Sequence, residues 1–136
     1  GVVSQRLVRR LCNKCKVPYE LDQAMADSMN GIRDLGMKRG DVIYRPNRNG
    51  CELCHYRGYS GRIAMEEVLE MWRREISRNV WAGNRLRPDW VDVVREQARL
   101  AGMSDMLTQG LRHMKNGVTS LDELERFFSA DLETLR

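Results

Sequence analysis

The sequence predicts a mixed α/β (α+β) fold, with a four-cysteine metal module in its first half and a cluster of helices in its second half. Three observations predict it. The cysteines form two Cys-x-x-Cys pairs, β-branched residues gather between Gly61 and Met71, and apolar residues recur at helical spacing from Ile76 onward. A chain of 136 residues supports one modest core, so we expect one domain or part of one.

Composition narrows the class of protein. Hydrophobic residues make up 42% and charged residues 31% of the chain, as in folded globular proteins rather than disordered or fibrous ones. The net charge of +4 is a mild excess spread along the chain, so we expect no nucleic-acid partner. No apolar run of about 18 residues and no secretory leader occur, so we expect neither a membrane span nor secretion.

The first half begins with an apolar periodic segment, residues 2–11, which has no capping residue before it and is expected to continue a larger helix or strand. After the first cysteine pair, Leu21, Met25 and Met29 recur at four-residue spacing up to Asn30-Gly31, which predicts a short helix. Residues 40–46 predict a turn, a short strand and a stop before the second cysteine pair.

The two cysteine pairs predict a metal site. Each Cys-x-x-Cys turn directs two sulfurs to one point, so Cys12, Cys15, Cys51 and Cys54 together would form a closed tetrahedral site. Zn²⁺ suits four thiolates, and with no open position the ion would be structural. A rubredoxin-like iron site and a redox dithiol or disulfide pair remain alternatives. The spacer of about 35 residues between the pairs does not identify a family.

No catalytic residue is predicted. His55 follows the last cysteine, but four sulfurs already complete a tetrahedron, and His113 has no cysteine or acid at ligand spacing. The sequence contains no nucleophile with a matching base and no Gly-x-x-x-x-Gly-Lys-Ser/Thr phosphate loop. The chain alone therefore cannot be argued to hydrolyse anything.

The second half predicts one strand or a strand pair and then helices. Between Gly61 and Met71 the expected strand residues are Ile63, Met65, Val68 and Leu69. Helices are expected around Ile76, Val80 and Trp81, and then from a first turn at Pro88 to Gly102, with Val91, Val94, Ala98 and Ala101 on the apolar face.

Two more helices are predicted near the C-terminus. The first carries a stripe that we expect to be core, made of Met103, Met106, Leu107, Leu111 and Met114. Gly117 is its expected C-terminal cap. Thr119 or Ser120 would cap the last helix, with Asp122 or Glu123 in capping-box position.

Three stretches, taken in order, resemble the C-terminal part of the GspE/PulE/PilB family of secretion and pilus assembly ATPases. Residues 4–12 are similar to its Gln-Arg-Leu-Val-Arg-x-Leu-Cys segment. Residues 44–62 are similar to its second cysteine pair and Gly-Tyr-x-Gly-Arg exit, and residues 102–123 to its Gly-Met, Gly-Leu and Gly-x-Thr-Ser/Thr-Leu-Glu-Glu ending. Ile63 and Ala64 depart from the family's usual Thr-Gly, and Gln109 stands where an acidic residue is common.

The resemblance implies an organisation in three parts: residues 1–11 end a RecA-like ATPase core, 12–62 form the zinc-ribbon-like tetracysteine insert, and 63–136 form strands and a helical subdomain. It implies a hexameric ATPase that uses ATP and Mg²⁺ to drive type II secretion or type IV pilus assembly. Gly61 and Arg62 would lie on the nucleotide side. The phosphate loop and the acidic and histidine boxes of the family would lie upstream.

The resemblance also implies partners and a location. Neighbouring subunits, an inner-membrane platform protein and cytoplasmic secretion or pilus proteins would be the partners, and the protein would be cytoplasmic and peripheral at the inner face of the inner membrane. The alternatives are a stand-alone zinc-ribbon protein that binds nucleic acid, for which Arg9, Arg57 and other basic residues near the cysteines would serve, and a split or degenerate family member.

Overall fold

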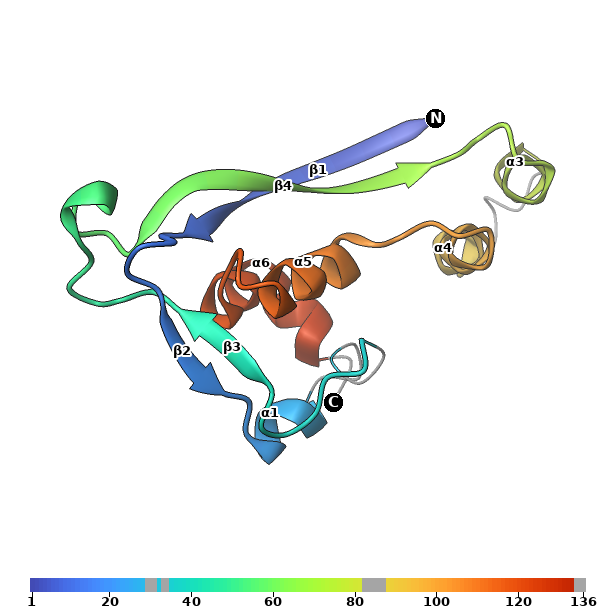
Figure 1. Cartoon of the computed structure of the whole chain (residues 1–136). Helices are drawn as coiled ribbons and strands as arrows, with labels where there is room; N and C mark the ends of the chain where they lie inside the picture. Colours follow the sequence, from blue (N-terminus) through green and yellow to red (C-terminus); the bar gives the residue numbers. More distant parts are fainter. Residues whose placement is uncertain (29–31, 33–34, 82–87, 134–136) are drawn as a thin grey trace. The chain divides into compact units, whose positions relative to one another are not determined.

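A computed structural model describes residues 1–28, 32, 35–81 and 88–133 of the chain (Figure 1). Along the described chain the elements are β1 (Val2–Leu11), β2 (Val17–Glu20), α1 (Gln23–Ser28), β3 (Val42–Arg45), the short 3-10 helix η1 (Glu52–Cys54), β4 (Tyr59–Leu69), α3 (Arg74–Trp81), α4 (Trp90–Leu100), α5 (Met106–Lys115) and α6 (Leu121–Glu133). The mixture of strands in the first half and helices in the second confirms the predicted α/β class.

The chain forms two compact units. The smaller unit consists of Gly1–Gln5 and Glu66–Met106, and the larger unit of Arg6–Met65 and Leu107–Arg136. Strands β1 and β4 pair in one two-stranded sheet, and each of them contributes residues to both units. The leading segment, expected to be a helix or a strand, is therefore a strand.

The second sheet pairs β2 with β3 in antiparallel register, with Pro18 opposite Tyr44 and Tyr19 opposite Ile43. Strand β3 matches the predicted strand between residues 40 and 46, whereas β2 was not predicted. A proline cannot donate a ladder hydrogen bond, so its presence argues against a central strand, but it is tolerated on an edge. In a sheet of two strands both strands are edges.

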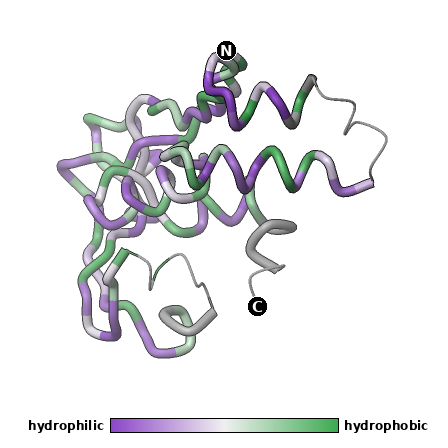
Figure 2. The backbone as a smooth tube through the Cα atoms, turned by 90° about the vertical axis from the view of Figure 1, so that its right-hand side faces the viewer, coloured by the Kyte–Doolittle hydropathy of each residue, from purple (hydrophilic) through white to green (hydrophobic). Residues whose placement is uncertain are grey.

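The smaller unit has an apolar cluster of its own. Ile76 on α3 is buried with Val94 and Ala98 on α4, and both predicted helices are confirmed. Figure 2 shows hydrophobic and hydrophilic residues alternating along α3 and α4, as expected for amphipathic helices.

Two details of α4 differ from the prediction. Pro88 precedes the N-cap residue Asp89, and Val91 is 46% exposed because it lies in the first turn, at the end of the packed stripe.

The larger unit has the main core. Its buried apolar side chains come from β1, β3, β4, α5, α6 and the loops between them: Val8, Leu11, Leu21, Ile32, Met37, Ile43, Met65, Leu111, Met114, Leu121, Leu124 and Phe128. The predicted methionine stripe is confirmed in part: Met106, Leu111 and Met114 on α5 are buried, whereas Leu107 is half-buried. Met103 precedes α5 and is a partly buried member of the cluster of the smaller unit. Of the predicted inter-cysteine helix, Leu21 precedes α1, and Met29 lies outside the described residues.

Helix α5 ends as predicted. Gly117 adopts a φ of +65°, and its amide and that of Val118 donate to the carbonyl oxygens of Met114 and His113 at 2.9 and 2.8 Å. A side chain at Gly117 would also meet the ring of Tyr44, because a Cβ there would lie 2.7 Å from Tyr44 Cδ2. Glycine is thus required both by the positive φ and by the close approach of the Tyr44 ring.

The turn before α6 completes the hydrogen bonding of β1. The amide of Leu11 donates to the carbonyl oxygen of Val118 at 2.8 Å, and Thr119 Oγ1 donates to the carbonyl oxygen of Arg9 at 2.8 Å. Ser120 is the N-cap, since its Oγ accepts from the amide of Glu123 at 3.3 Å. This segment therefore supplies partners that an adjacent strand would otherwise provide.

Glu123 does not close the predicted capping box. Its side chain is only 2% exposed, and its carboxylate instead receives the amide of Arg9 at 3.1 Å and the Arg9 guanidinium at 2.6 and 2.8 Å. Burial acts to raise the pKa of Glu123, but the hydrogen bonds and charge of Arg9 outweigh it and hold this pKa below its usual value of 4.5. The carboxylate is thus kept ionised inside the larger unit.

Replacing Gly110 by alanine should destabilise the chain. A Cβ at this position in α5 would lie 2.7 Å from Leu124 Cδ2 and 2.9 Å from Met65 Sδ, so both core side chains would have to shift. We expect a loss of about 1–3 kcal/mol in the free energy of unfolding, measured by urea denaturation. Arg112→Ala, on the exposed face of the same helix, is the control and should change this energy by less than about 0.5 kcal/mol. Equal stability of the two variants would contradict the packing.

Stability should depend on Glu123 at acid pH. A group whose folded-state pKa lies below its unfolded value stabilises the fold above the unfolded pKa, and this contribution is lost as the pH falls below 4.5 toward the folded-state pKa. Glu123→Gln should cost about 1.5–3 kcal/mol at pH 7 and should flatten the decline of stability below pH 4.5. The exposed neighbour Asp122→Asn serves as control. An unchanged acid profile in Glu123→Gln would rule out this role.

Candidate metal centre and the adjoining cavity

The two cysteine pairs lie on two tight turns. The first turn follows β1, where the carbonyl oxygen of Cys12 accepts from the amides of Cys15 and Lys16 at 3.2 and 2.9 Å. The second contains η1, where the carbonyl oxygen of Cys51 accepts from the amides of Cys54 and Tyr56 at 3.1 and 2.9 Å. Each turn thus brings its two sulfurs to the same side.

The four sulfurs lie together although their sequence positions are far apart. All lie within 4.8 Å of one another, with Cys12 to Cys51 at 3.7 Å and Cys15 to Cys54 at 3.8 Å. Four sulfurs placed about 2.3 Å from a tetrahedral zinc ion would be about 3.8 Å apart. A disulfide would need about 2.05 Å, and all four cysteines are free. The predicted set therefore has the spacing of a four-thiolate metal site, not that of two disulfides.

Backbone amides support the thiolate form of Cys54. Its sulfur accepts from the amides of Cys51 and Gly58, both at 3.2 Å. Desolvation opposes ionisation, but these hydrogen bonds prevail and lower the pKa of Cys54 to about 6. Desolvation and hydrogen bonds from the other three thiols raise the pKa of Cys15 to about 12. Four thiols this close cannot all ionise without a cation between them. A Zn²⁺ ion would supply this positive charge.

The second turn needs unusual backbone conformations. Gly58 has a φ of +71°, and a Cβ there would lie 2.7 Å from the carbonyl oxygen of Asn47. His55 and Tyr56 also have positive φ values, +50° and +60°, which side chains other than glycine adopt rarely. These conformations allow the chain to leave Cys54 and still place the amide of Gly58 on its sulfur.

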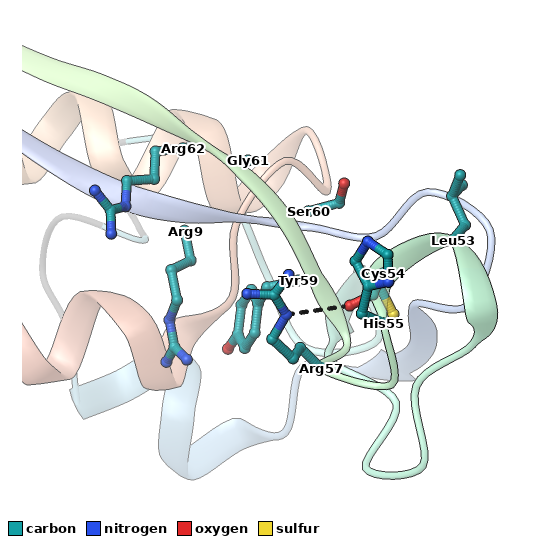
Figure 3. Close-up of a pocket in the computed structure, with 9 residues that line it drawn as sticks. All are labelled: Arg9, Leu53, Cys54, His55, Arg57, Tyr59, Ser60, Gly61 and Arg62. Atoms are coloured by element: carbon teal, nitrogen blue, oxygen red, sulfur yellow. Dashed lines mark hydrogen bonds between the residues drawn. The ribbon is translucent and has the colours of Figure 1, made fainter.

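Neither histidine belongs to the four-sulfur cluster, as expected: His55 is exposed on the second turn, and His113 is half-buried in α5. The remaining predicted site residues are Gly61 and Arg62. Gly61, with a φ of +77°, and Arg62 lie in β4, where both line a cavity of about 570 Å³ (Figure 3). The cavity is lined by Arg9, Leu53, Cys54, His55, Arg57, Tyr59, Ser60, Gly61 and Arg62.

The walls of the cavity are held by specific contacts. The guanidinium of Arg9 lies 4.1 Å from the ring centre of Tyr59, and Tyr59 shares a 2.8 Å hydrogen bond with Ser120. Arg57 Nε donates to the carbonyl oxygen of Cys54 at 3.4 Å, the dashed line in Figure 3. The pairing of Arg9 with Glu123 was not predicted, because nothing in one sequence connects two residues so far apart.

These features define a mixed α/β protein with a tetracysteine site suited to a structural metal ion. The family model described as type II/IV secretion system protein matches residues 1–126. The chain belongs to this family, which confirms the resemblance seen in the sequence.

Individual relatives of the chain carry names that fit this family. The chain is 34% identical over 128 residues to the type IV pilus assembly ATPase PilB of Thermus thermophilus, covering 91% of this chain and 13% of the relative. It is 35% identical over 127 residues to the type IV pilus assembly ATPase PilB of Myxococcus xanthus, covering 90% and 20%. With the type II secretion system ATPase E of Vibrio cholerae it shares 30% identity over 128 residues, covering 93% and 22%. The chain thus spans about a fifth or less of the length of the PilB proteins of Thermus thermophilus and Myxococcus xanthus.

Among the residues that the structure describes, no helix has both the length and the apolar character needed to cross a bilayer.

Metal content is the direct measurement on the four sulfurs. We expect elemental analysis of the purified chain to find about one zinc per chain, and chelation to release thiols that were unreactive before. Cys51→Ser should abolish stable zinc binding and remove folding energy on the order of 10 kcal/mol from this region. Ser60→Ala, on the nearby cavity wall, should keep its zinc. Iron in place of zinc, or two disulfides, would refute a zinc site.

Proposed function

We propose that this chain is the C-terminal segment of a hexameric cytoplasmic ATPase that powers type II secretion or type IV pilus assembly. In this proposal the segment supplies a structural zinc module and contacts to neighbouring subunits and to the inner-membrane platform protein. The observation that carries it is the convergence of four cysteine sulfurs in a chain that belongs to the secretion family.

The organisation of the chain supports a module built on a strand pair. Residues 1–11 would end a RecA-like core, since β1 runs directly into Cys12. Residues 12–62 would form the zinc-binding insert, and β4 leads out of it into the helices of residues 63–136. A fully coordinated zinc ion has no open position for water, so its role would be to stiffen the insert rather than to take part in a reaction.

Hydrolysis would depend on the rest of the protein. This sequence contains no phosphate loop, so the parts of the parent protein outside it would bind ATP and Mg²⁺. Gly61 and Arg62 would lie on the nucleotide side. Support for a cationic role of Arg62 comes from its place on a cavity wall with two further arginines. The protein would act at the cytoplasmic face of the inner membrane.

The test is a double substitution in the full-length protein. Cys12→Ser with Cys51→Ser should abolish pilus assembly or secretion in the bacterium and should lower the ATPase activity of the purified hexamer, while the 136-residue chain alone should be inactive. Arg39→Ala, an exposed substitution between the cysteine pairs, should leave both unchanged. Wild-type assembly and ATPase activity in the double cysteine variant would refute the structural role of the module.

A further inference from the structure

The four cysteines of the candidate metal centre differ in their exposure. Cys12 is fully buried and Cys54 is 2% exposed, whereas Cys15 and Cys51 are partly exposed. Each of the two turns therefore carries one buried cysteine and one that solvent reaches. Oxidation of a cysteine follows its exposure, so a dissolved oxidant attacks Cys15 or Cys51 first.

Each partly exposed cysteine has its sulfur against that of a buried cysteine on the other turn. Cys51 Sγ is 3.7 Å from Cys12 Sγ, and Cys15 Sγ is 3.8 Å from Cys54 Sγ. A disulfide of about 2.05 Å requires the sulfurs of each pair to approach by only about 1.7 Å. An accessible cysteine beside a second cysteine that can resolve it is the arrangement of redox-sensing pairs.

Cys51 has a second neighbour, since the sulfur of Cys54 on its own turn is also 3.8 Å away. The sulfur of Cys54, however, accepts hydrogen bonds from the amides of Cys51 and Gly58, both at 3.2 Å. Hydrogen bonds that stabilise a thiolate make it a weaker nucleophile. Cys12 accepts no hydrogen bond at its sulfur from an amide of the described residues, so it is the better partner for an oxidised Cys51. Cys54 is then left for Cys15.

The backbone holds the two turns together without the sulfurs. The amide of Cys12 donates to the carbonyl oxygen of Gly58 at 3.0 Å, which ties the end of β1 to the second turn. Strands β2 and β3 pair within the loop between the cysteine pairs. Disulfides across the two turns can therefore form while the surrounding fold persists.

We propose that the four-cysteine centre is a peroxide-sensitive switch, which holds Zn²⁺ when reduced and releases it when disulfides join Cys12 to Cys51 and Cys15 to Cys54. Hydrogen peroxide is the oxidant. The Cys51 thiolate attacks it, so that the O–O bond breaks, an S–O bond forms and one hydroxide leaves. The Cys12 thiolate then attacks the sulfenic sulfur, which forms the S–S bond and releases the second hydroxide. The same steps at Cys15 and Cys54 use a second peroxide, so four thiolates give four electrons to two peroxide molecules.

The inference rests on the proposed function, because it adds regulation to the structural zinc module of the parent ATPase. A disulfide at Cys54 removes the thiolate charge on which the amides of Cys51 and Gly58 converge. Gly58 leads directly into β4, which carries Gly61 and Arg62. Oxidation would therefore loosen the turn that precedes the proposed nucleotide side.

Peroxide titration of the reduced, zinc-loaded 136-residue chain tests the switch. A coloured zinc chelator should report about one zinc released for every two equivalents of peroxide, with the loss of all four thiols. Proteolysis after Lys14, Arg48 and Glu52 places each cysteine on a different peptide, so mass spectrometry without reductant distinguishes every pairing. Disulfides across the turns should exceed those within a turn at least about tenfold.

Two variants with three cysteines and one histidine as ligands isolate each pair, because histidine also binds zinc. Cys15→His should keep zinc and, with peroxide, form only the disulfide between Cys12 and Cys51. Cys51→His should keep zinc and form only the disulfide between Cys15 and Cys54. If a histidine variant fails to bind zinc, the peptide map of the wild-type chain decides the pairing.

The outcomes separate the switch from the module. Disulfides within the turns as main products would overturn the proposed pairing. Zinc that stays bound in about a tenfold excess of peroxide would overturn the switch and leave the structural zinc module standing. A reduced chain without zinc would refute the module. In the full-length protein, peroxide should lower the ATPase activity, and reductant with zinc should restore it; unchanged activity after zinc release would refute the regulation.

Discussion

The larger unit is organised by the convergence of four cysteine sulfurs where β1 ends and β4 is about to begin. The sulfurs of residues separated by about 40 positions lie 3.7 Å apart, a distance that thiolates tolerate only with a cation between them. Among the described residues of the loop between the cysteine pairs, Leu21, Ile32, Met37 and Ile43 are buried. In the proposed function, a metal ion at the four sulfurs would add to the energy that keeps this loop folded.

The same constraint shapes the surface around it. Because the amide of Gly58 must reach the sulfur of Cys54, the chain passes through left-handed conformations at His55 and Tyr56 and then enters β4. This route places Arg57, Arg62 and Leu53 in the lining of the same cavity. The four-sulfur site and the cationic cavity are thus two consequences of one turn.

The carboxylate of Glu123 links α6 to β1 within the larger unit. Together with Val118 and Thr119 it satisfies the backbone of β1 through side-chain and main-chain groups, without an additional strand. It also neutralises Arg9 and orients it over Tyr59. A buried carboxylate with this many donors is stable as an anion, and it leaves the cavity with two available cations instead of three.

The sequence by itself determined the local features. Cysteine spacing identified the four sulfurs, glycine and proline marked the turns, and apolar periodicity located α3, α4, α5 and β4, because each of these signals depends on residues a few positions apart. Only the tertiary structure decided the rest. The β2–β3 pairing, the use of Glu123 on Arg9 rather than in a capping box, and the gathering of Arg9, Arg57 and Arg62 join distant positions, and such contacts follow from how the chain packs rather than from any local pattern.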